Sequence, residues 1–203
     1  ISLVNATLNL FKEAFENKEN KYFILLSDKC IPLYNPDSLY DKVIKMDNNI
    51  VSCYPPKNGG YPDFPRWDYR RCVIRFNKLN KKGFFNCKKF FKQHQWLLLD
   101  RKTTKFFISN DYTNKFGKKS EVPDEHYFIN IMKKFKIPFI NKTITFINRE
   151  SPSELSIYRK YPKTYSTLTN DMVKDILKTE NLFMRKVVKE CILPSYFINF
   201  NFD

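Results

Sequence analysis

Apolar positions recur along the chain with two different periods, which predicts a mixture of helices and strands. Helical spacing holds over residues 2–17, and a polar stretch at 17–20 closes this segment. The compact apolar run at 22–26 is typical of a buried strand and ends at Ser27-Asp28. This order of helix, strand and polar tip indicates an α/β layer, in which ligands bind beyond the carboxyl ends of the strands.

The rest of the chain predicts further elements joined by polar loops. The expected helices span 37–46, 101–109, 123–135 and Thr169 or Asn170 to about 178. The expected strands span 49–54, 70–76, 95–99 and 143–147. The expected loops span 55–65 and 148–163. Because no repeat or low-complexity linker interrupts the pattern, we expect one mixed α/β domain over residues 1–203.

Composition allows a packed core and gives the chain a strong positive charge. Hydrophobic residues make up 42% of the 203 residues and aromatic residues 17%. With 36 Lys and Arg against 21 Asp and Glu, the formal charge is +15. Such a field attracts nucleic acid, membrane surfaces or phosphorylated small molecules. The basic residues are spread along the sequence, so charge alone leaves the partner open.

The sequence contains little that suggests a bound metal. Its five cysteines form no CxxC pair, and only two histidines are present, so we expect no structural zinc site. The odd number of cysteines excludes complete intramolecular pairing. The five are Cys30, Cys53, Cys72, Cys87 and Cys191.

No apolar stretch approaches the ~20 residues that cross a bilayer. The sequence has no initiator Met and opens directly in a helical pattern. We therefore expect that an N-terminal portion precedes residue 1 and could carry a membrane anchor. A type II anchor there would indicate the secretory membranes, whereas a viral or bacterial source would indicate the cytoplasm.

Residues 122–128 carry the main catalytic candidate. Pro123 fixes the start of the predicted helix, which places Glu125 in its first turn. On a continuous helix Glu125 shares a face with the apolar positions three, four and seven residues later, while Asp124 points to a more polar side. A poorly solvated but ionised carboxylate suits a general base. Acidic residues are also favoured in first helical turns regardless of function, so both interpretations stay open.

Four sequence blocks extend this picture. FILLSDKCIPLYN at 23–35 closely resembles the LLSDSCIPLYN signature of the Core-2/I-branching enzymes, a glycosyltransferase family. PDEHY at 123–127 matches another block of that family. Two weaker blocks are QHQW at 93–96 with Asp100-Arg101, similar to GSQW…R, and YPKTY at 161–165 with LFMRK at 182–186, similar to HPxTF…LFARKF. The blocks follow the order of the family and cover about residues 3–187.

The resemblance implies a glycosyltransferase A-type fold, a Rossmann-like mixed sheet flanked by helices. It also implies inverting transfer from a nucleotide-sugar, UDP-sugar in particular, to a hydroxyl of a glycan or glycoprotein. The base of the family falls on Glu125. Its diphosphate-binding basic positions fall on Lys163 and Lys186, and no metal or other cofactor is expected. The competing interpretation of each lysine is a solvated surface charge.

Four more residues are candidates to line the active site: Asp28, Trp96, Asp124 and Arg185. Asp28 lies at the tip of a predicted strand and could equally cap the following turn. Trp96 could stack on a sugar ring, although packing in the core is the more usual role.

Two departures from the family pattern limit the inference. Lys92-Gln93-His94 replaces the small residues that usually precede QW, and Arg149 stands where a Trp is common, so acceptor choice cannot be carried over. Two alternatives remain at this stage. A nucleic-acid-binding domain is suggested by the charge and the aromatic residues but opposed by the ordered blocks. A catalytically inactive glycan-binding relative is opposed by the presence of Glu125.

Overall fold

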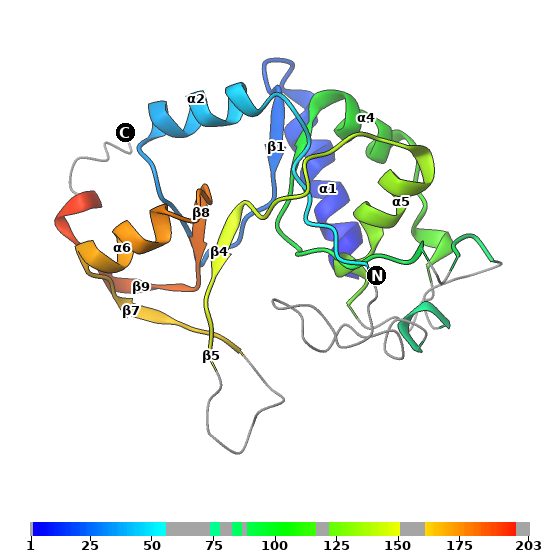
Figure 1. Ribbon diagram of the computed structural model, residues 1–203. Coiled ribbons are helices and arrows are strands. Elements are labelled where there is room, and N and C mark those ends of the chain that lie inside the picture. Colours follow the sequence, from blue (N-terminus) through cyan, green and yellow to red (C-terminus); the bar gives the residue numbers. More distant parts are fainter. Residues whose placement is uncertain are drawn as a thin grey trace. The chain divides into compact units, whose positions relative to one another are not determined.

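The computed structural model describes residues 2–55, 74–77, 83–86, 89–116, 122–150 and 161–197, and the chain divides into two compact units (Figure 1). Unit 1 consists of Ile1–Leu25 and Asn48–Lys142, and unit 2 of Leu26–Asp47 and Thr143–Asp203. Each unit combines helices with short strands, which confirms the mixed α/β class in general terms. That both units belong to one catalytic domain stays a prediction.

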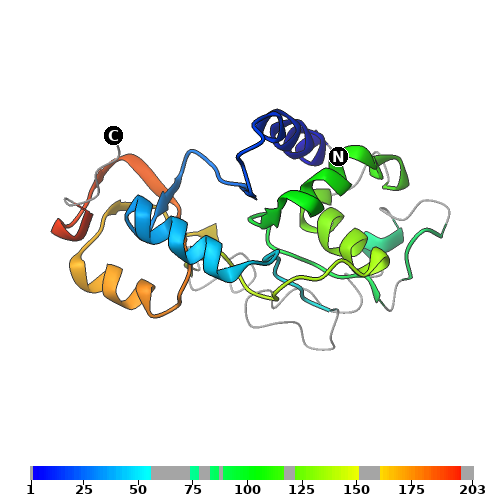
Figure 2. The same cartoon turned by 90° about the horizontal axis from the view of Figure 1, so that it is seen from above.

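In the described part of unit 1, helices α1, α4 and α5 pack with a short antiparallel strand pair. In the pair, Phe23 lies opposite Leu99. Helix α1 lies beside α4, as Figures 1 and 2 both show. The helices are α1 (Ser2–Glu16), α4 (Arg101–Ser109) and α5 (Tyr127–Phe135), and the strands are β1 (Tyr22–Ile24) and β3 (Leu98–Asp100).

Aromatic rings fill the core of unit 1. The Phe11 ring lies 6.3 Å from Phe23 and 6.1 Å from Phe128, measured between centroids. Phe107 of α4 meets Phe128 edge-on at 4.9 Å. These edge-on arrangements are the favoured geometry for ring pairs and add to the effect of burying large apolar side chains. The aromatic contacts therefore hold α1, α4, α5 and β1 together.

Arg101, from the QW…R block, has a structural role in unit 1. Its guanidinium donates to the carbonyl oxygens of Phe15, Asn17 and Asn20, each at 2.9 Å. It also lies 4.0 Å from the centroid of the Phe15 ring. Carbonyl groups at a helix C-terminus lack intrahelical donors and attract cations. Arg101 thus ties the end of α1 to the start of α4.

The described part of unit 2 contains three small sheets, two α-helices and the 3-10 turn η5 (Ser195–Phe197). The three-stranded sheet has the order β2-β8-β4, with β8 antiparallel to β2 and parallel to β4. The pairs β5-β6 and β7-β9 are antiparallel and parallel respectively. The strands are β2 (Cys30–Pro32), β4 (Thr145–Ile147), β5 (Arg149–Glu150), β6 (Tyr161–Pro162), β7 (Tyr165–Thr167), β8 (Phe183–Arg185) and β9 (Val187–Ile192). The helices are α2 (Pro36–Met46) and α6 (Asn170–Leu177).

The core of unit 2 lies between α6 and its neighbouring strands. Leu33, Val173 and Met184 are fully buried there. Thr169 is the N-cap of α6, and its hydroxyl accepts a hydrogen bond from the Met172 N–H at 3.3 Å. The predicted cap and helix are therefore confirmed.

The sequence predicted the long elements better than the short ones. The helices expected at 2–17, 37–46 and 101–109 and the strand at 143–147 are confirmed to within two residues at each end. The strand expected at 95–99 begins only at Leu98. The expected loop 148–163 contains β5 and β6, while 151–160 lies outside the described residues, as does 56–65 of the other loop.

Two predicted strands are wrong in the residues that the structure describes. In the segment 49–54 the backbone N–H groups bond to different partners: Ile50 to Leu98, Val51 to Ile140 and Tyr54 to Lys92. Isolated bridges therefore replace a continuous ladder. Of the segment 70–76, residues 74–76 belong to a helical turn at 74–77, and 70–73 lie outside the described residues.

Candidate functional site

Glu125 lies at the end of a short 3-10 turn and not in the first turn of a long helix. The turn η3 spans Pro123–Glu125, the chain breaks helical geometry at His126 with φ −136°, and α5 begins at Tyr127. The predicted continuous helix over 123–135 is therefore wrong at its start. A 3-10 turn has about three residues per turn instead of about 3.6, so side chains leave it in different directions.

This break reverses the expected places of the two carboxylates. Asp124 was expected on a polar side but is only 6% exposed. The Glu125 side chain, expected at the buried end of an apolar stripe, is 23% exposed. The Asp124 Oδ1 atom has no hydrogen-bond partner in the described part of the chain. Burial raises the pKa of Asp124, and a backbone hydrogen bond and the nearby charges of Lys92 and Arg75 only partly oppose this.

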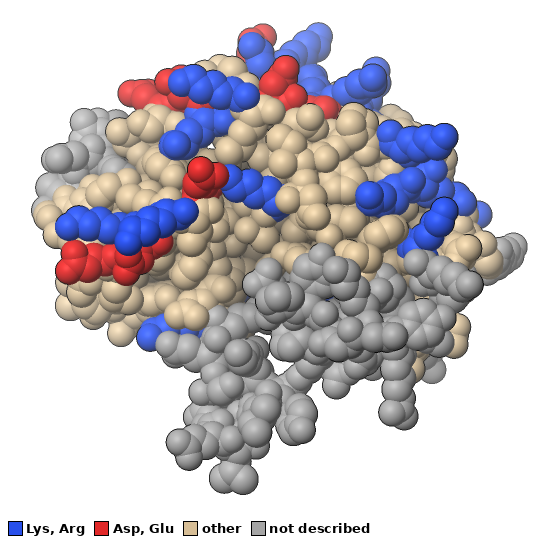
Figure 3. Space-filling view, viewed as in Figure 1, with Lys and Arg blue, Asp and Glu red and all other residues tan. Residues whose placement is uncertain are grey.

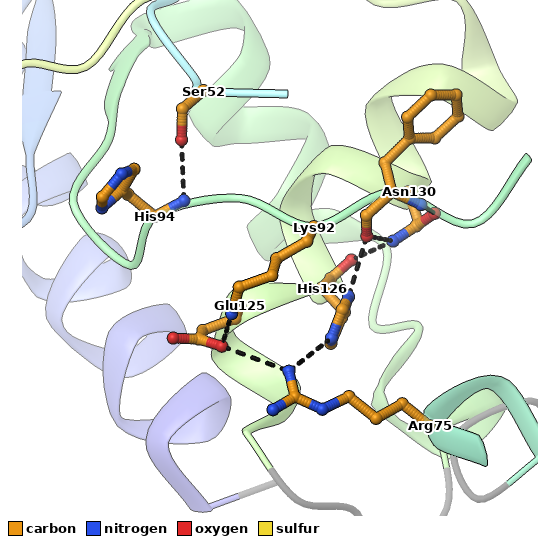
Figure 4. Close-up of polar contacts among 8 residues, drawn as sticks. Ser52, Arg75, Lys92, His94, Glu125, His126 and Asn130 are labelled. Atoms are coloured by element: carbon orange, nitrogen blue, oxygen red, sulfur yellow. Dashed lines mark hydrogen bonds and ion pairs between the residues drawn. The ribbon is translucent and has the colours of Figure 1, made fainter. Parts of the chain in front are cut away.

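Two cations hold one oxygen of Glu125 (Figure 4). The Lys92 ammonium forms an ion pair with Oε2, and the Arg75 guanidinium lies 3.4 Å from the same atom. Figure 4 shows the other oxygen, Oε1, turned away from both cations, and no described residue forms a hydrogen bond or ion pair with it. The Lys92 side chain is only 6% exposed, so an opposite charge is needed to offset the loss of its hydration.

His126 is buried and supports Arg75. Its Nδ1 lies 2.8 Å from the Phe91 carbonyl oxygen, which can only accept, so Nδ1 carries the proton. Nε2 is then an acceptor and faces the Arg75 guanidinium at 3.5 Å. Burial, together with the charge of Lys92, lowers the pKa of His126 well below its usual range. His126 is therefore neutral near pH 7.

The segment that carries Lys92 is fixed on both sides. Asn130 accepts from the Phe91 N–H and donates to the Phe91 carbonyl, each at 2.8 Å. The Gln93 N–H donates to the Glu125 carbonyl at 2.9 Å, and the Gln93 side-chain oxygen accepts from the first turn of α5 at 2.6 Å. Lys92 thus reaches Glu125 from a backbone that is tied to the same turn.

Residues 92–94, which depart from the family pattern, are all buried and hydrogen-bonded. Next to Lys92 and Gln93, the His94 N–H donates to the Ser52 hydroxyl at 2.7 Å, and its ring meets Tyr54 edge-on at 5.6 Å. Sequence reasoning noted this departure but assigned it no role. It missed Lys92 because lysine is usually exposed, and Arg75 because 50 residues separate it from Glu125.

The other candidate basic residues meet in unit 2. The Lys186 N–H donates to the Lys163 carbonyl at 3.4 Å, so the two predicted diphosphate-binding lysines lie on adjoining backbone segments. The Arg185 Nε donates to the Ser27 hydroxyl at 3.3 Å. The turn that begins at Ser27 carries Asp28. Four candidate residues of unit 2 therefore lie on neighbouring backbone segments: Asp28, Lys163, Arg185 and Lys186.

The candidates form two groups, one in each unit. Glu125, Asp124 and Trp96 belong to unit 1, whereas Asp28, Lys163, Arg185 and Lys186 belong to unit 2. Trp96 is 5% exposed, as expected for a side chain that packs in the core. The roles of all seven residues in catalysis or binding stay predictions.

The described residues also bear on the distribution of charge, on metal binding and on membrane crossing. In Figure 3, lysine and arginine side chains lie in several separate groups on the visible face. Within the described ranges, no three His, Cys, Asp or Glu side chains gather closely enough to hold a metal ion. No helix in those ranges combines the length and the apolar character needed to cross a membrane. Cys30, Cys53 and Cys191 are free thiols, and Cys72 and Cys87 lie outside the described residues.

Comparison with known proteins identifies the family. Curated proteins gave no match. The sequence model of the Core-2/I-Branching enzyme family, however, matches residues 1–192, which is nearly the whole chain. This confirms the resemblance in the four blocks and implies a sugar donor and a glycan acceptor in general terms. The chain therefore belongs to the Core-2/I-Branching enzyme family of glycosyltransferases.

Proposed function

We propose that the protein is an inverting glycosyltransferase that moves a sugar from a UDP-sugar to a hydroxyl of a glycan or glycoprotein, with Glu125 as its base. The observation that carries this proposal is the setting of Glu125. One carboxylate oxygen is paired with two cations, and the other has no partner among the described residues. An ionised, oriented carboxylate with a vacant lone pair is what a general base requires. The proposed fold is the glycosyltransferase A type.

In the proposed reaction Glu125 takes the proton from the acceptor hydroxyl. The hydroxyl oxygen forms a bond to the anomeric carbon from the face opposite the nucleotide, and the bond from that carbon to the diphosphate oxygen breaks. The electron pair of the broken bond leaves with the diphosphate. A single in-line displacement of this kind inverts the anomeric configuration, and it needs no second carboxylate of the glycosidase type.

The leaving diphosphate gains negative charge, which we propose is stabilised by Lys163 and Lys186. Their adjoining backbone segments support a common task. Fixed cations aimed at developing charge are worth roughly 3–4 kcal/mol each in comparable sites. Lysines in this role would take the place of a divalent metal, and Asp28 and Arg185 would line the same surface. Metal-independent transfer is thus part of the proposal.

A donor screen with the full-length protein tests this function. The protein is incubated with a panel of UDP-sugars and glycan acceptors, with and without EDTA, and the product linkage is determined by NMR. We expect transfer that survives EDTA and a product anomer opposite to that of the donor. A product with the donor configuration would contradict inversion, and loss of activity on chelation would contradict the metal-free mechanism.

Lysine variants test the proposed donor site separately. Lys163→Met and Lys186→Met should weaken UDP binding and lower kcat, because each removes a charge that faces the diphosphate. Lys189→Met, at an exposed position of β9, is the matched control and should bind UDP like the unaltered protein. Equal UDP affinity in all four proteins would contradict this assignment.

A further inference from the structure

Lys92 is a nearly buried lysine, and its position beside Glu125 calls for a functional explanation. A lysine that is only 6% exposed normally carries a large hydration penalty, and such a residue is rare unless it is paired. Here the partner is the proposed base itself. The backbone around Lys92 is tied to Tyr54 on one side and, through Gln93, to the Glu125 carbonyl on the other. The pair is therefore built into the fold and is not an incidental surface contact.

Resting on the proposed function, we propose that Lys92 is a positioning residue that keeps Glu125 ionised and directs its Oε1 atom to the acceptor hydroxyl. The Lys92 ammonium and the Arg75 guanidinium both hold Oε2. Oε1 is then the oxygen that receives the proton. Because a neighbouring cation favours the charged form of a carboxylate, removing Lys92 should leave Glu125 protonated at a higher pH.

The other groups around η3 do not supply this effect in place of Lys92. Arg75 is 26% exposed, so solvent screens its charge more than that of Lys92, which is 6% exposed. His126 is neutral, and Asp124 would add a negative charge and not a positive one. Helix α1 packs against η3, and the side chains it buries are the uncharged Val4, Thr7 and Phe11. Among the described groups, Lys92 is therefore the main positive charge that acts on Glu125.

An NMR titration of the side-chain carboxyl carbon of Glu125 tests the proposal without relying on activity. The signal is assigned by its loss in Glu125→Gln. In Lys92→Met, which keeps a long apolar stem, the titration midpoint should rise by about one pH unit or more. Lys92→Arg, which keeps the charge, should stay close to the unaltered protein. Lys102→Met, at an exposed position of α4, is the control and should leave the midpoint unchanged.

The same variants have a second readout in catalysis. The acid limb of the pH profile of kcat/KM should move upward in Lys92→Met and not in Lys92→Arg or Lys102→Met. A purely structural role for Lys92 would lower the rate equally at every pH and leave the limb in place. If Lys92→Met does not fold, the Lys92 Nζ resonance of the unaltered protein should still shift at the pH at which Glu125 titrates.

Failure of the positioning role of Lys92 and failure of Glu125 as the base give different experimental results. An unchanged carboxyl midpoint in folded Lys92→Met, or a Lys92 Nζ signal that ignores the Glu125 titration, would overturn the positioning role. Normal turnover by Glu125→Gln would instead overturn the proposed base, whatever the titration shows.

Discussion

Asn130 offers a sharp test of how the site is held, because it is a buried amide with three hydrogen bonds. It is 2% exposed, accepts from the Phe91 N–H, and donates to the carbonyls of Phe91 and His126 at 2.8 and 2.7 Å. In Asn130→Ala both carbonyls keep another donor, the His126 ring and the Asn130 N–H respectively. The Phe91 N–H loses the side-chain acceptor that the structure gives it.

The expected loss of stability follows from the hydrogen bonds that Asn130→Ala removes. An unsatisfied buried N–H costs about 1–3 kcal/mol, and each of the two lost bonds to carbonyls contributes about 1 kcal/mol. We therefore expect Asn130→Ala to lower the free energy of unfolding by about 3–5 kcal/mol. With a urea m-value of about 2 kcal/mol/M, the midpoint should fall by roughly 1.5–2.5 M.

Urea denaturation followed by circular dichroism and tryptophan fluorescence measures this change. Asn110→Ala is the matched control, because Asn110 is exposed and its side chain donates one bond, to the Phe106 carbonyl at 2.8 Å. Its free energy of unfolding should stay within about 0.5 kcal/mol of that of the unaltered protein. If Asn130→Ala were no more destabilising than Asn110→Ala, the described network would not hold the segment around Lys92.

Three further predictions concern stability. Arg101→Met should cost about 2–3 kcal/mol in urea unfolding, because its charged bonds to the end of α1 are lost, and an unchanged midpoint would refute that anchoring role. The lowered pKa of His126 means that the unfolded chain binds a proton more readily, so stability should fall as the pH drops below about 6.5, and His126→Phe should flatten that fall. The raised pKa of Asp124 means that stability is lost as the pH rises above about 3.8. Asp124→Asn should therefore stabilise the protein near neutral pH but not below pH 3.8. A uniform effect at every pH would contradict this.

The sequence predicts those elements that have a long periodic pattern or a clear cap. Helix α1 has both a regular apolar stripe and a polar end, and Thr169 marks the start of α6. Segment 49–54 has the composition of a strand, but its hydrogen-bond partners come from two distant parts of the chain, 92–98 and 140. A local pattern contains no information about such partners, so the isolated bridges could not be predicted.

The candidate site is likewise only partly predictable from local sequence patterns. Glu125 is found from the PDEHY block, but its exposure depends on the break at His126, which a helical-wheel argument cannot include. Lys92 and Arg75 come to Glu125 from residues 33 and 50 positions earlier in the chain. Neither has a sequence signal other than its charge, and most lysines and arginines are solvated. Long-range packing therefore decides which basic residues meet the carboxylate.

The most direct test of the account is the rate of sugar transfer by Glu125→Gln in the full-length protein. Single-turnover transfer is measured with saturating UDP-sugar, next to Glu13→Gln, an exposed carboxylate of α1, as the control. We predict that Glu125→Gln lowers the rate by at least about 100-fold, the usual contribution of a general base, while UDP affinity is unchanged. Transfer by Glu125→Gln at a rate comparable to that of Glu13→Gln would contradict the assignment of Glu125 as the base.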